Sequence, residues 1–171
     1  MTIIPGPLSE TLDELQAALN LIHTFQPPAR VVQIDIVDGE YADNITLEPG
    51  ALHFVENYGM QFDLHLMTVE PIDFLGEVQN LKSLRRVIAQ VERMDSIGDF
   101  ITTVKEDLGV EAGISLDLYT QLETVGDDIL DSLDQLSVVQ VMGNQAGVQG
   151  QPLSATAIET LRKVVQYRER H

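Results

Sequence analysis

The chain alternates short β-branched runs with longer segments whose apolar residues recur every three or four positions. This alternation is repeated six times along the 171 residues, and it predicts parallel βαβ units. The predicted strands cover residues 2–5, 31–36, 61–66, 84–91, 110–116 and 136–142.

Each predicted strand is followed by a segment with helical spacing. The first helix is expected to bury one apolar stripe, formed by Leu8, Leu12, Leu15, Leu19 and Ile22. The last helix is expected to begin after Ser154 as N-cap and to bury the stripe Ile158, Leu161 and Val165. A capping-box pattern of Ser96 and Asp99 predicts a fourth helix start, and two shorter helices are predicted over residues 49–58 and 71–78.

Composition limits the kind of protein further. The chain is 44% hydrophobic and carries no linker-like tract, so we expect a single domain over residues 1–171. Its 27 acidic and 10 basic residues give a net charge of −17, which argues against a nucleic-acid partner. No apolar run approaches the roughly 20 residues of a membrane span, and no basic leader precedes one, so we expect no membrane association and a cytoplasmic location. The absence of cysteine excludes thiolate chemistry.

Ionisable side chains stand near the ends of the second and third predicted strands. Asp35 points inward from a strand of apolar neighbours, where an unpaired carboxylate is costly to bury, so a functional role is favoured over a structural one. Alternation places Asp63, His65 and Met67 on one face, which favours His65 as a site residue over a core histidine. Asp38, before a glycine, fits a turn as well as a site. The other histidines, His23, His53 and His171, are predicted to lie on the surface.

Three blocks of sequence resemble the ribulose-phosphate 3-epimerase family. The segment from Val32 to Thr46 is similar to its His-x-Asp-x-Met-Asp-Gly stretch and the following Asn-Ile-Thr. Residues 62–71 resemble its Asp-x-His-Leu-Met and later Pro, and residues 141–151 align without gaps on its Val-Met-x-Val-x-Pro-Gly-Phe-Gly-Gly-Gln loop. Weaker matches lie at Val91-Glu92 and over residues 113–120, so the resemblance runs from about residue 4 to about residue 162.

This resemblance implies a (β/α) TIM-type barrel, of which about six of the eight βα units are present. It implies metal-assisted interconversion of D-ribulose 5-phosphate and D-xylulose 5-phosphate through an enediolate, an isomerase reaction. By position, Asp35 is the catalytic acid/base, and Asp35 and His65 are ligands of a divalent metal of the Zn, Fe or Mn type. The implied substrate-binding residues are Met67, Met142, Gly147, Gly150 and Gln151.

The departures from the family pattern gather in the site. Gln33 replaces a histidine ligand, Gln90 replaces a second histidine, Gly6 replaces a serine, and positions 145, 146, 148 and 149 depart from the phosphate loop. The seventh and eighth strands, with the second proton-transfer aspartate, are not seen. We therefore expect weak or absent metal binding and weak or no turnover. The alternative is a non-catalytic module that binds a sugar phosphate or forms oligomers. A partial barrel also leaves two strand edges open, which predicts a homo-oligomer.

Overall fold

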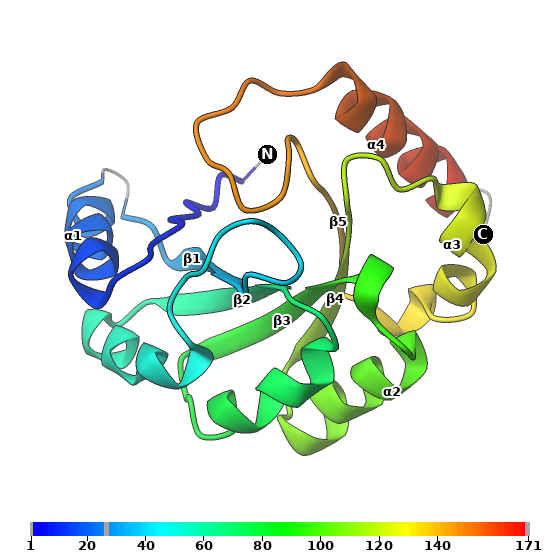
Figure 1. Cartoon of the computed structure of the whole chain (residues 1–171). Helices are drawn as coiled ribbons and strands as arrows, with labels where there is room; N and C mark the ends of the chain where they lie inside the picture. Colours follow the sequence, from blue (N-terminus) through cyan, green and yellow to red (C-terminus); the bar gives the residue numbers. More distant parts are fainter. Residues whose placement is uncertain (1, 26–27, 170–171) are drawn as a thin grey trace.

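The chain forms a five-stranded parallel sheet with helices around its outer face (Figure 1). This computed structural model describes residues 2–25 and 28–169. The strands are β1 (Val31–Val37), β2 (Gln61–Met67), β3 (Leu84–Gln90), β4 (Glu111–Leu116) and β5 (Val138–Val141). Their order in the sheet is their order in the chain, and every neighbouring pair is parallel. The predicted α/β class is thereby confirmed.

The connecting helices begin and end at residues that favour those positions. Helix α1 (Leu12–His23) starts with a complete capping box of Thr11 and Glu14. The 3₁₀ helices η1 (Pro49–Tyr58) and η2 (Pro71–Val78) each have proline in the first turn, and Gly59, with φ 65°, ends η1. The remaining elements are η3 (Val91–Arg93), α2 (Ile97–Thr102), η4 (Thr103–Asp107), α3 (Leu122–Leu130), η5 (Leu133–Gln135) and α4 (Ala155–Arg168).

The main core lies between the outer face of β1, β2 and β3 and the helices that cover it. Strand residues such as Val32, Leu64 and Val87 meet helix residues such as Leu19 and Phe100 there. A second, smaller apolar cluster lies under α3 and α4, with four fully buried members. In the described residues no helix is long and apolar enough to cross a membrane.

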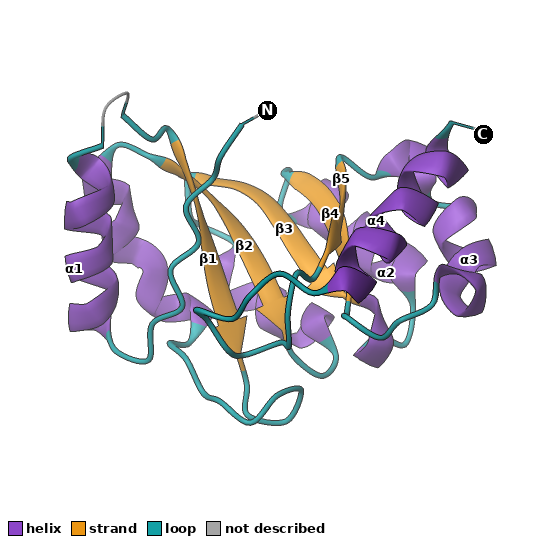
Figure 2. Ribbon diagram, turned by 90° about the horizontal axis from the view of Figure 1, so that it is seen from above, coloured by secondary structure: helices purple, strands orange, loops and turns teal. Residues whose placement is uncertain are grey.

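The sheet curves but does not close (Figures 1 and 2). Within residues 2–25 and 28–169, no strand pairs with the free side of β5. The strand predicted over residues 2–5 is not formed. That segment runs beside β1 and is tied to it by a hydrogen bond from the Gln33 N–H to the Pro5 carbonyl, 2.8 Å long. In the described residues this is the one backbone hydrogen bond that the segment makes to β1, and Pro5 has no N–H group to add to a ladder.

The helix predictions are mostly right at the caps and partly wrong on the buried faces. In α1, Leu15, Leu19 and Ile22 are buried as predicted, but Leu12 is 38% exposed and Leu8 lies before the helix begins. Ser154 and Ser96 accept hydrogen bonds from Thr156 N–H and Asp99 N–H, as expected of N-caps. In α4, however, the predicted buried stripe is exposed, with Leu161 at 50%. The buried positions are instead Ala157 and Thr160. The periodicity correctly locates an apolar stripe, but Leu161 and Val165 line a groove beside β5, and no strand of the described residues covers them.

Candidate active site

Each of the five strands contributes a polar residue to the inner face of the sheet, near its carboxyl end. We call this set the polar layer: Asp35, His65, Gln90, Ser115 and Gln140. In the register, Asp35 pairs with His65, and Gln90, Ser115 and Gln140 pair in turn. Since His65 itself pairs with Ile88, the layer steps by two residues between β2 and β3. The intervening residues of each strand point to the core, as alternation requires. Carboxyl ends of parallel strands are where α/β folds gather their functional groups.

The predicted pair Asp35 and His65 is in direct contact. His65 Nδ1 lies 3.0 Å from Asp35 Oδ1, the histidine side chain is fully buried, and the aspartate side chain is 19% exposed. The same carboxylate oxygen accepts a 2.8 Å hydrogen bond from Gln33 Nε2. Asp35 is therefore held in place by one imidazole and one amide, with part of its surface open to the inner side of the sheet.

Two further glutamines surround His65. Gln140 Nε2 lies 3.4 Å from both ring nitrogens, and the Gln90 amide lies 3.4 Å from Nε2. The Gln90 amide is best satisfied with its NH₂ group 3.1 Å from the Ser115 carbonyl, which turns its oxygen toward His65. Buried polar groups need such partners, and here two amides supply them together with the Asp35 carboxylate at Nδ1.

The residues present do not fit a divalent metal ion. In the part of the chain that the structure describes, no three His, Cys, Asp or Glu side chains converge on one point. The pair Asp35 and His65 supplies two donors, and Gln33 presents an N–H group to the carboxylate where the resemblance places an imidazole ligand. An amide is a poor ligand for zinc-like ions, and three protein ligands are the usual minimum for a catalytic zinc site.

A second group of residues ties together the loops at the strand ends. Glu92 accepts hydrogen bonds from the Tyr41 hydroxyl at 2.9 Å, from the Asp117 N–H at 2.7 Å and from the Thr120 hydroxyl. Burial, and then the charge of Glu92, raise the pKa of Tyr41 well above its ordinary value. Tyr41 therefore remains a neutral donor to Glu92.

Asp38 has a structural position. Its Oδ1 accepts from the N–H groups of Glu40 and Tyr41, and its Oδ2 accepts from Val69 N–H at 2.7 Å. These three bonds fold the loop after β1 and attach it to the loop after β2. Of the two roles left open by the sequence, this geometry supports the turn.

The other predicted site residues are spread over the same end of the sheet. Met67 is buried with Val37 and Ala146, and Met142 packs against this group, so an apolar cover lies beside the polar layer. Gly147 is buried, with φ 75° and its carbonyl accepting from Asn44 Nδ2, and an added Cβ would lie 2.9 Å from the Ala42 Cβ. Gly150 and Gln151 are exposed. His23 and His53 lie on the surface, as predicted, and His171 is outside the described residues.

Gln140 and Asp117 were not singled out as site residues from the sequence. A neutral glutamine in a strand is an unspecific signal, and only its period-two position opposite Ser115 places Gln140 on the inner face. Asp117 stands where the resembling family has asparagine, in the segment 113–120. That substitution is the signal by which it could have been found.

The comparisons agree on one family. The model of the "Ribulose-phosphate 3 epimerase family" matches residues 3–171. The chain is 29% identical over 138 residues to the ribulose-phosphate 3-epimerase of Escherichia coli (strain K12), covering 80% of this chain and 59% of the relative. It is 27% identical over 139 residues to that of Chlamydia muridarum (strain MoPn / Nigg), covering 81% and 58%. For the Serratia marcescens protein the values are 28% over 136 residues, 78% and 62%. The chain thus spans about three-fifths of the length of these relatives.

Proposed function

Because this chain belongs to the ribulose-phosphate 3-epimerase family, we propose that it binds a pentose 5-phosphate at the carboxyl ends of its strands. We further propose that it interconverts D-ribulose 5-phosphate and D-xylulose 5-phosphate slowly or not at all. The observation that carries this proposal is the contact of Asp35 with His65, accompanied by Gln33. The pair of Asp35 and His65 is the first thing that such a site needs. Gln33 stands where the site would need a further imidazole ligand.

The reaction removes a proton beside a carbonyl and returns one on the opposite face. Asp35 is the proposed base, because its carboxylate is partly exposed on the inner face and is oriented by His65 and Gln33. The proposed substrate-binding residues are Met67, Met142, Gly147, Gly150 and Gln151. A divalent metal would polarise the carbonyl in such chemistry, but the donors present do not fit one. Weak or absent metal binding is therefore part of the proposal, and slow turnover follows from it.

The test is a coupled epimerase assay on the purified protein, with metal content measured in parallel. We expect little turnover and less than one equivalent of metal. Asp35→Asn is expected to remove any turnover present, since a positioned acid/base group contributes roughly 10²- to 10⁴-fold. Glu40→Gln, which removes an exposed carboxylate in the loop after β1, is the matched control and should change little. Fast turnover that survives Asp35→Asn would contradict the proposal.

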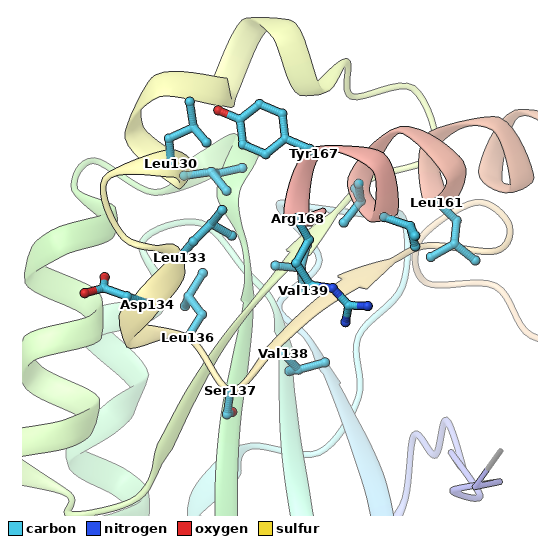
Figure 3. A pocket seen from close by; sticks show the side chains of 13 residues that line it. Leu130, Leu133, Asp134, Leu136, Ser137, Val138, Val139, Leu161, Tyr167 and Arg168 are labelled. Atoms are coloured by element: carbon cyan, nitrogen blue, oxygen red, sulfur yellow. The ribbon is translucent and has the colours of Figure 1, made fainter. Parts of the chain in front are cut away.

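A second candidate function is that of a non-catalytic module that associates with itself. The specific observation is the exposed apolar face of α4, formed by Ile158, Leu161 and Val165. Among the described strands, β5 has β4 on one side and no partner on the other. A groove of about 570 Å³ between them is lined by apolar side chains from α3, η5, β5 and α4, including Leu133, Val139 and Leu161 (Figure 3). Apolar surface of this kind favours association.

The proposed occupant is a second copy of the chain. Residues 2–5 run beside β1, no described strand pairs with their other side, and Ile3 is 80% exposed. Each copy therefore presents two open edges that another copy can cover. Leu161→Glu is expected to shift the light-scattering mass toward the monomer. Leu21→Glu, at a leucine of α1 that is also exposed, is the control that should leave the mass unchanged. A monomeric unmodified protein at micromolar concentration would contradict self-association.

Lack of a nucleic-acid partner and a cytoplasmic location remain predictions from composition. The net charge of −17 supports the first, since it would repel a phosphate backbone.

A further inference from the structure

The imidazole of His65 has an oxygen acceptor beside each of its nitrogens. Nδ1 lies 3.0 Å from Asp35 Oδ1, and Nε2 lies 3.4 Å from the Gln90 amide, whose oxygen is turned toward the ring. The lone pairs and N–H bonds of an imidazole lie in the plane of its ring. The protein itself therefore occupies both in-plane positions of this buried ring, which leaves neither nitrogen directed at a metal ion.

The Gln140 amide contacts the same ring from another direction. Its Nε2 lies 3.4 Å from Nδ1 and 3.4 Å from Nε2 of His65. In the ring plane, a position at this distance from both nitrogens would collide with ring carbon atoms, so the amide nitrogen lies over the face of the imidazole. Such a contact with a ring face is weak. Its further contact in the described residues is Met142 Sδ at 3.9 Å, and a thioether is also a weak acceptor.

The other amides of the site are already used. Gln33 Nε2 donates to Asp35 at 2.8 Å, and the NH₂ group of Gln90 lies 3.1 Å from the Ser115 carbonyl. Among the described residues, the contacts of Gln140 Nε2 include no carbonyl or carboxylate oxygen. The Gln140 and Asp35 side chains are both partly exposed on the inner face of the sheet. Gln140 can therefore donate a hydrogen bond to a ligand that Asp35 also reaches.

We propose that Gln140 donates a hydrogen bond to the carbonyl oxygen of the bound ketose, and that this bond polarises the carbonyl without a metal ion. This inference rests on the proposed function and names the donor at the same site. His65 Nδ1 lies 3.4 Å from Gln140 Nε2 and 3.0 Å from Asp35 Oδ1, so the donor and the base are separated by less than the sum of these distances. A base on one carbon and a donor to the neighbouring carbonyl oxygen are roughly 5–6 Å apart.

The proton transfer is balanced with these groups alone. Asp35 takes the proton from the carbon beside the carbonyl, and the electrons of that C–H bond form the double bond of the enediolate. The π electrons of the carbonyl move to its oxygen, and the Gln140 N–H faces the negative charge that develops there. A neutral amide stabilises such a charge less than a cation does, which agrees with the slow turnover that we propose.

The test is the infrared band of the ligand's carbonyl group. Because its terminal hydroxyl is phosphorylated, D-ribulose 5-phosphate keeps an open-chain ketone, and ¹³C at that carbon separates its C=O stretch from those of the protein. Gln140→Met keeps the length of the side chain and removes the amide. We expect the band of the bound sugar at lower wavenumber in the unmodified protein than in this variant. The loss of one hydrogen bond should also weaken binding about fivefold in Kd.

The control variant is Gln135→Met, which replaces an exposed glutamine of η5, before the amino end of β5. The carbonyl band in this variant should equal that in the unmodified protein. EDTA should leave the band of the unmodified protein unmoved, because the proposed donor is an amide. As a measurement that needs no variant, the side-chain ¹⁵N–H signals of Gln140 should shift when D-ribulose 5-phosphate is added.

The outcomes separate this inference from the proposed function. If the sugar binds with the same carbonyl band in the unmodified protein and in Gln140→Met, or if EDTA moves the band, the role of Gln140 is overturned and the proposed binding of a pentose phosphate stands. If Gln140→Met does not fold, unmoved Gln140 side-chain signals in the unmodified protein overturn it equally. If D-ribulose 5-phosphate does not bind to the unmodified protein, both proposals fail.

Discussion

Strands β2 and β5 are both rich in apolar residues, yet they differ sharply in burial. Six of the seven residues of β2 are buried, whereas no residue of β5 is fully buried. Strand β2 has a parallel neighbour on each side and a helical layer over its outer face. In the part of the chain that the structure describes, β5 pairs with β4 alone. A parallel strand is thus buried by what flanks it, and its own composition does not decide the matter.

Helices α1 and α4, which lie outside the sheet, differ in burial in the same way. Leu15 and Leu19 of α1 are fully buried against the sheet, whereas Leu161 and Val165 of α4 stay exposed. Both helices carry an apolar stripe at helical spacing. The part of the molecule built on β1 to β3 is therefore expected to hold most of the stability, and the part built on β5 and α4 the least.

The largest expected effect tests this contrast directly. Leu64→Ala in β2 removes a fully buried side chain from the main core and should lower the free energy of unfolding by about 2–5 kcal/mol. Val139→Ala in β5 removes a smaller, half-buried side chain and should cost roughly 1 kcal/mol or less. Urea unfolding of both variants provides the measurement. Equal losses would show that the two strands are equally supported.

The contact between β4 and β5 offers the next test. A Cβ on Gly113 of β4 would lie 2.5 Å from Val138 Cγ1 and 3.3 Å from the Val138 carbonyl of β5. Gly113→Ala should therefore push β5 away and cost about 1–3 kcal/mol. Gly126→Ala in α3 meets nothing within 4 Å and should stabilise by up to about 1 kcal/mol. If thermal unfolding shows Gly113→Ala to be neutral, β5 is too loosely held to resist the methyl group.

The smallest effects are two pH dependences of opposite sign. Glu111 makes a hydrogen bond with Arg86, which lowers the pKa of Glu111 from the ordinary 4.5. The ionised Glu111 therefore stabilises the fold above pH 4.5, and this stabilisation is lost as the pH falls through the lowered pKa. The pKa of Asp117 is raised from 3.8, so its charged form costs stability once the pH exceeds the raised pKa.

Two matched variants separate these contributions. At pH 7, Glu111→Gln should melt at a lower temperature than the unmodified protein and Asp117→Asn at a higher one, and both differences should shrink at pH 3. Melting curves at the two pH values are sufficient. A difference of the same sign for both variants would refute the stated environments.

Much of the scaffold could be predicted because local rules decide it. The bounds 49–58 and 71–78 match η1 and η2, where proline at the start and glycine at the end of η1 leave little choice, although both are 3₁₀ rather than α helices. Strand β2 begins at Gln61 as predicted, because a turn with φ 65° at Gly59 precedes it. The buried face of α4 could not be predicted, since periodicity records a stripe and not whether a neighbour covers it.

The candidate site also contains residues whose positions could be predicted from the sequence and residues whose positions could not. Asp35 and His65 could be placed together, because their strands are adjacent and their side chains share one face by alternation. The amides of Gln90 and Gln140 depend on the register of three further strands, which no local pattern gives. Among the described residues no donor reaches the buried Oδ1 of Asp117. This environment depends on how loops from distant segments pack, which only the structure shows.

Because the order of strands in the sheet follows their order in the chain, each strand from β2 to β5 pairs with the strand that comes just before it. Each pairing spans only one crossover, which keeps contact order lower than in folds whose first and last strands pair. The units can therefore assemble one after another as the chain leaves the ribosome, beginning with β1 and β2. Refolding is expected to start there, and mutations in that unit to slow folding more than mutations in β5, which should mainly speed unfolding.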